Sequence, residues 1–110
     1  MQKPLTKQKI KSIKFPSDFQ ALLWSKNINK IDFQKDRIYV IHQILAYGDM
    51  KDIHILFKIY PESLITEIFL NYPLKIYTKP VFRFVKSFIL NIKDNLAEEK
   101  YVKDFPRSIK

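Results

Sequence analysis

Cysteine is absent from this sequence, and glycine occurs once, at Gly48. Without cysteine the chain has no disulfide framework, no thiolate metal site and no cysteine nucleophile. Small secreted domains commonly depend on disulfides, so we expect a reducing, cytoplasmic location. A single glycine also excludes the glycine-rich loops that cradle phosphate groups.

Long apolar runs are missing as well. A membrane-spanning helix needs about 18 apolar residues or more. The best candidate, residues 81–92, is interrupted by Arg83, Lys86 and Ser87. The basic N-terminus is not followed by the apolar segment of a signal peptide. We therefore expect no contact with a membrane.

Clusters of catalytic or metal-binding residues are also missing. The only histidines, His42 and His54, lie on different predicted helices and lack the spacing of metal ligands. Asp49 and Asp52 resemble a carboxylate pair, but both fall in the first turn of a predicted helix, where acidic residues complement the helix dipole. The sequence therefore predicts a protein without enzymatic activity, metal or cofactor, which acts by binding.

The positive charge is concentrated at the two ends of the chain. The formal net charge is +9. Residues 17–78 hold equal numbers of basic and acidic side chains, whereas residues 79–110 hold eight basic and four acidic ones. This distribution argues against a uniformly basic nucleic-acid-binding core. Residues 1–16 hold five lysines and no acidic residue: Lys3, Lys7, Lys9, Lys11 and Lys14.

Apolar residues recur at helical spacing along most of the chain, which predicts an all-α fold. We expect a compact bundle of about five short helices over residues 15–92. A flexible basic arm, residues 1–14, precedes it and a charged C-terminal tail, residues 93–110, follows it. The predicted helices begin near Ser17 and then span about residues 33–47, 50–59, 61–71 and 80–92.

Capping residues stand at the predicted helix ends. Asp32 is placed to cap the helix at 33–47, and Gly48 follows its last apolar residue, where a left-handed C-cap is expected. Asp49 is placed to cap the next helix. Pro61 and Pro80 suit the first turns of the last two helices, because proline lacks the N–H that would be unpaired there.

Two predicted helices offer candidate partner-binding surfaces. The helix at 50–59 is apolar on two faces, and Ile55 and Ile59 form the second of them. In the last helix an apolar stripe lies opposite a basic one, which is either a solvated face or a contact for phosphates or an acidic partner. The apolar stripe consists of Val81, Phe84, Val85, Phe88, Ile89 and Ile92. Aromatic residues are otherwise assigned mostly to the core. The candidate partner-binding residues are Ile55, Ile59, Lys79, Phe82, Arg83, Lys86 and Lys93.

Residues 49–71 have the outline of a helix-turn-helix. The second helix would carry Glu62 and Glu67 into a groove lined by phosphates, which would repel them. We interpret the pair as packing architecture, and an atypical use in DNA binding as the alternative.

Several short motifs resemble a family of small prokaryotic proteins of unknown function. The most specific piece is Tyr47-Gly48-Asp49 with Trp24 upstream, and the resemblance covers about residues 15–92. Members are commonly encoded beside nucleotidyltransferase-type toxins of the abortive-infection class. The resemblance implies an antitoxin-like role, and it carries over no catalytic residue. At His54 and Phe82-Arg83 the sequence departs from the family pattern, where further aromatics are expected.

Two functional hypotheses follow. The first is an antitoxin that neutralises a nucleotidyltransferase-type toxin by protein–protein contact. The second is a transcriptional regulator that binds operator DNA with the helix-turn-helix and the basic arm, whose affinity would fall steeply with salt. The residues leave the oligomeric state open.

Overall fold

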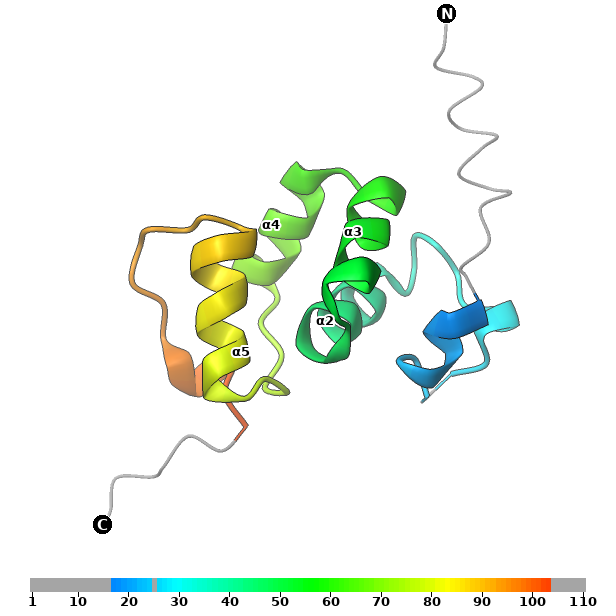
Figure 1. Cartoon of the computed structure of the whole chain (residues 1–110), viewed down its shortest axis with the longest axis horizontal. Helices are drawn as coiled ribbons and strands as arrows, with labels where there is room; N and C mark the ends of the chain where they lie inside the picture. The colour runs from blue at the N-terminus through cyan, green and yellow to red at the C-terminus, as the bar shows by residue number, and fades with distance from the viewer. Residues whose placement is uncertain (1–16, 25, 104–110) are drawn as a thin grey trace, which may run out of the picture. The chain divides into compact units, whose positions relative to one another are not determined.

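The structure is a computed structural model that describes residues 17–24 and 26–103. Helices dominate this part of the chain, and no strand occurs in it, which confirms the predicted all-α class (Figure 1). The chain divides into two compact units, residues 1–60 and 61–110. The predicted arm at residues 1–14 lies outside the described residues.

In its described residues the first unit contains two 3-10 helices, η1 (Ser17–Ala21) and η2 (Ile28–Lys30), and two α-helices, α2 (Arg37–Tyr47) and α3 (Met50–Ile59). Phe19 and Leu23, four residues apart, are fully buried at η1. From α2 a continuous run of side chains, residues 40–46, is buried, and α3 adds Ile53 and Leu56. Burial of these apolar side chains provides the main stabilisation of the unit.

Polar contacts hold the irregular segments of this unit against its helices. Gln43, almost fully buried on α2, donates from Nε2 to the Leu22 carbonyl over 2.7 Å. The Tyr60 hydroxyl donates to the Phe33 carbonyl over 2.8 Å, and the two rings stack with centroids 4.5 Å apart. Burial raises the pKa of the Tyr60 phenol, so it remains a hydrogen-bond donor at physiological pH.

Asp32 caps a turn rather than the helix itself. Its Oδ1 accepts the N–H groups of Gln34 and Lys35 over 2.8 and 2.7 Å, and these bonds hold its pKa below the usual range. The predicted helix start at residue 33 is therefore four residues too early, because residues 33–36 form turns and α2 begins at Arg37.

Gly48 joins α2 to α3 without adopting the predicted left-handed conformation. Its φ and ψ are −78° and 160°, which any residue can adopt. Glycine is needed for space instead, because a Cβ would lie 2.7 Å from the Ile44 carbonyl oxygen and 2.9 Å from Asp52 Cβ. Beside it, Asp49 and Asp52 form a reciprocal capping box at the start of α3, which confirms Asp49 as the cap.

We expect Gly48→Ala to lower the free energy of unfolding by about 1–3 kcal/mol, because the new methyl group overpacks this junction. Urea denaturation followed by circular dichroism measures the change. Met50→Ala, at an exposed position two residues away, serves as the control and should shift the midpoint much less. An unchanged midpoint for Gly48→Ala would refute the close approach.

The second unit contains α4 (Glu62–Asn71), α5 (Lys79–Phe84), the π-helical turn η3 (Val85–Ile89) and the 3-10 helix η4 (Glu98–Lys100). Its core includes four buried aromatic side chains: Phe69, Tyr77, Phe82 and Tyr101. The Tyr101 ring lies 4.8 Å from both the Phe69 and the Phe82 ring, between centroids. Its hydroxyl donates to the Phe69 carbonyl over 2.7 Å.

The folded chain extends past the predicted domain boundary at residue 92. Tyr101 and Val102 are almost fully buried, although they belong to the segment predicted as a charged tail, residues 93–110. An isolated parallel bridge pairs Tyr77 with Val102, and Tyr77 accepts from the Lys103 N–H over 2.9 Å. Residues 93–103 are thus part of the second unit, and residues 104–110 lie outside the described part.

The last predicted helix, expected to reach residue 92, ends at Ile89 because Asn91 takes a left-handed conformation with φ 54°. The N–H of Leu90 bonds to the Val85 carbonyl and that of Ile92 to the Lys86 carbonyl, each over 2.8 Å. Asparagine tolerates this conformation better than most residues other than glycine. Asn91 is therefore the residue that reverses the chain.

Asn91→Gly should leave the stability nearly unchanged or raise it slightly, whereas Asn91→Val should lower the free energy of unfolding by about 1–2 kcal/mol. The reason is that a β-branched side chain is strained at positive φ. Thermal and urea unfolding of the two variants provides the comparison. Equal stability of the two would show that the left-handed turn is not formed.

Candidate partner-binding surfaces

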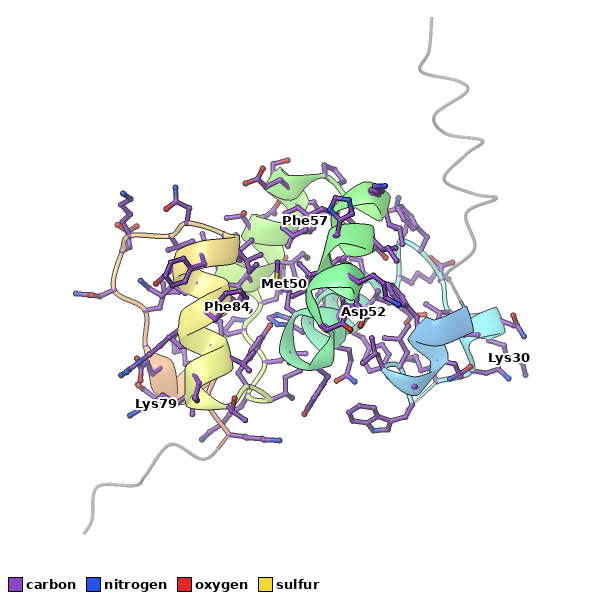
Figure 2. All side chains as sticks on the ribbon, in the orientation of Figure 1. Lys30, Met50, Asp52, Phe57, Lys79 and Phe84 are labelled. Carbon is purple, nitrogen blue, oxygen red and sulfur yellow. The ribbon has the colours of Figure 1, made fainter. Side chains whose placement is uncertain are left out.

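The two predicted contact residues on α3 are half-buried. Ile55 and Ile59 are both only partly accessible, so neither stands out as an exposed apolar anchor. The strongly exposed apolar side chain of α3 is Met50, with 57% of its surface accessible, in the first turn beside Asp52 (Figure 2). The second apolar face of this helix is therefore partly covered by the folded unit and is not an exposed contact surface.

Phe82 is not available to a partner. It is 1% exposed, and its ring lies 6.0 Å from that of Phe69 and 4.8 Å from that of Tyr101. The core-facing side of α5 and η3 is formed by Phe82 and Val85, which are three residues apart. The prediction of Phe82 as a contact residue is therefore wrong, because the buried side of the segment runs through Phe82 and Val85, whereas Phe84 of the predicted apolar stripe is exposed.

Two cations of the predicted basic stripe, Arg83 and Lys86, make polar contacts within the second unit. Arg83 Nε lies 3.3 Å from Glu98 Oε2, and the Arg83 side chain stays 61% exposed. The ammonium group of Lys86 donates to the Ile92 carbonyl over 3.0 Å. Lys79 is exposed at the start of α5 (Figure 2), whereas Lys93 follows the left-handed turn and leaves the helical face. The four cations therefore do not form one continuous surface.

Phe84 and Phe88 belong to the predicted apolar stripe, but both side chains are exposed. Phe84 is 40% and Phe88 77% accessible, and their ring centroids lie 5.8 Å apart. Phe88 belongs to the π-helical turn, a geometry that often occurs at functional sites. Exposure of a paired aromatic surface is unusual enough to suggest binding.

A second exposed aromatic pair lies in the first unit. Trp24 is 58% and Tyr47 37% accessible, and their rings meet edge to face with centroids 5.0 Å apart at 64°. Trp24 follows the buried Leu23, and Tyr47 is the last residue of α2 before Gly48. The Gln43–Leu22 hydrogen bond joins the two segments. The two parts of the Trp24 and Tyr47-Gly48-Asp49 motif are therefore neighbours in space.

The described residues contain neither a metal-binding cluster nor a helix that could span a membrane. His42 is fully buried on α2 and His54 is exposed on α3. No group of three or more His, Cys, Asp or Glu side chains able to hold a metal ion occurs within residues 17–24 and 26–103. In the same ranges no helix is both long and apolar enough to cross a bilayer.

The exposed side of α4 carries both of its carboxylates. Glu62 and Glu67 are accessible, together with Ser63, Leu70 and Asn71. These are the side chains that α4 offers to a ligand, and a phosphate-lined groove would repel the two glutamates. The five arm lysines, predicted to contact nucleic acid or an acidic partner, lie outside the described residues.

Comparison with known protein families gives a match to part of the chain. Residues 19–69 are similar to a family of unknown function (DUF6922). No curated protein and no solved structure matches the chain. The matched segment contains the Trp24–Tyr47 pair and α3, whereas α5 and its exposed phenylalanines lie beyond it.

Phe82→Ala should lower the free energy of unfolding by about 3–5 kcal/mol, because it creates a cavity in the aromatic core. Phe88→Ala should change it by about 0.5 kcal/mol or less, since this ring is mostly solvated. Urea unfolding of the two single variants measures both values. A large loss for Phe88→Ala would mean that this ring is part of the core.

Proposed function

We propose that this protein is a non-enzymatic binding module that neutralises a nucleotidyltransferase-type toxin by protein–protein contact. The observation that supports this proposal most strongly is the exposed Trp24–Tyr47 pair. The pair contains two elements of the motif that resembles antitoxin-like proteins, and it lies inside the segment matched by the family of unknown function.

Tryptophan and tyrosine suit such a contact energetically. Both bury a large area with few rotatable bonds, and both are enriched among the residues that dominate binding energies. The edge-to-face arrangement restrains both rings before a partner arrives. The segment that precedes Trp24 is restrained too, because Gln43 binds the Leu22 carbonyl. A partner therefore meets a surface that needs little ordering, which favours affinity.

A wider partner surface is proposed from the exposed residues that follow Tyr47 in the chain. Met50 adds a further exposed apolar side chain from the first turn of α3, and the exposed Asp49 and Lys51 supply charges of both signs. A central apolar contact with a polar rim is the usual composition of a protein–protein interface. Such a complex would form in the cytoplasm, where a toxin of this class finds its substrates.

Trp24→Ala and Tyr47→Ala test the proposal. We expect each to weaken the complex at least about tenfold, which is the loss typical of an interface hot spot. The chain is co-expressed with the product of the adjacent gene, affinity-purified and run on a size-exclusion column, while growth reports on toxicity. Tyr72→Ala, which removes a similarly exposed aromatic ring from the second unit, is the matched control.

Three outcomes separate the hypotheses. Co-elution that both aromatic variants abolish, with toxicity restored, supports the proposal. Failure of the unaltered chain to bind or to relieve toxicity overturns it. A chain that elutes alone but shifts operator DNA in a salt-sensitive manner would favour the regulator hypothesis, against which the exposed glutamates of α4 argue.

A further inference from the structure

Two helical segments of the second unit carry stripes with the same sequence spacing, and the last two residues of the second stripe lie in the π-helical turn η3. On α4 the stripe consists of residues at positions i, i+1, i+4, i+5, i+8 and i+9, and so does the stripe on α5 and η3. Such spacing gathers side chains on one side of a helix. The α4 stripe is Glu62, Ser63, Thr66, Glu67, Leu70 and Asn71, and the α5 stripe is Lys79, Pro80, Arg83, Phe84, Ser87 and Phe88.

The α4 stripe is acidic and slightly concave. Its six residues line one shallow hollow on the surface of the helix. Glu62 and Glu67 give it two negative charges and no positive one, and Leu70 adds an apolar side chain with 39% of its surface exposed. A ligand that fits this stripe must supply positive charge and an apolar group.

The α5 stripe supplies both properties. Lys79 and Arg83 give it two positive charges and no negative one, and Phe84 and Phe88 give it a protruding aromatic pair. Figure 2 marks Lys79 and Phe84 on α5. The charges and the apolar side chains of this stripe therefore complement those of the α4 stripe on the same chain.

We propose that the α5 stripe of one copy docks on the α4 stripe of a second copy. Phe84 and Phe88 then cover Leu70 and the hollow around it, and the two cations lie against the two glutamates. Because the two contacting surfaces differ, the association is head to tail, and it continues into rings or short chains rather than stopping at a symmetric dimer.

Charge on the second unit favours another copy over a nucleic acid. Arg83 pairs with Glu98 over 3.3 Å and its side chain stays 61% exposed, so any acidic partner, a second copy included, shares this cation with Glu98. A polyanion would in addition approach the exposed Glu99 and Asp94, which follow the same helix in the chain. A second copy brings only two carboxylates, spaced five residues apart on a helix, and it covers the exposed phenylalanines as well.

Sedimentation velocity of the full chain over a wide concentration range is the first test. We expect the weight-average mass to rise above the 13.2 kDa of one chain as concentration increases, and to fall again when salt screens the charges. A mass that stays at that of one chain at every concentration overturns the proposal.

Two variants then identify the surfaces. Phe88→Asp disables the α5 stripe, and Glu67→Lys disables the α4 stripe. Each alone should reduce self-association at least about tenfold, the effect expected of a central contact. Met50→Asp, at another exposed apolar position, in the first unit, should leave self-association unchanged, and circular dichroism checks that all three variants fold.

Mixing the two disabled variants is the decisive measurement. The Phe88→Asp chain keeps an intact α4 stripe, and the Glu67→Lys chain keeps an intact α5 stripe, so together they should form a one-to-one pair and nothing larger. A misfolded variant would not regain association in this way. Absence of the pair, or a symmetric dimer that Glu67→Lys does not weaken, refutes the head-to-tail contact.

Discussion

The contact of Tyr101 with Phe69 and Phe82 is the interaction on which the second unit depends. The tyrosine ring packs against residues of α4 and α5, and its hydroxyl satisfies a carbonyl of α4 over 2.7 Å. Both helices are short, and α5 has only six residues before the π turn, so neither would be stable alone in water. The aromatic packing therefore determines which side of α5 is buried, and it leaves Lys79, Arg83 and the two exposed phenylalanines on the solvent side.

Much of the helical fold was predictable because capping residues and apolar periodicity agree. The start of α3 follows from Asp49, and its predicted range of 50–59 is the observed one. The end of the last helix was not predictable from periodicity, since Ile92 continues the apolar spacing while Asn91 reverses the chain. Gly48 was correctly predicted to end α2, but for the wrong physical reason. The glycine is required because a Cβ would lie too close to the Ile44 carbonyl oxygen, and not because of its backbone angles. Local sequence patterns report backbone preferences, but they do not report which atoms will meet.

The candidate surfaces were harder to predict than the fold. Phe82 and Phe84 are two residues apart on one amphipathic segment, and the sequence alone favoured the burial of Phe84. The long-range contact with Tyr101 selects Phe82 instead, because a residue 19 positions further along the chain completes its surroundings. One local signal could have identified Trp24 as exposed. Phe19 and Leu23 are four residues apart and both fully buried, so the next residue must point elsewhere.

The pairing of Tyr77 with Val102 has a consequence for the order of folding. Until residues 101–103 leave the ribosome, Phe69 and Phe82 lack the ring that separates them from water, and the Tyr77 backbone lacks its two bridging partners. The first unit contains its own buried side chains and is already synthesised before these residues emerge. During that interval the nascent chain presents unsatisfied aromatic surface. This is a stage at which a chaperone or a binding partner could capture it.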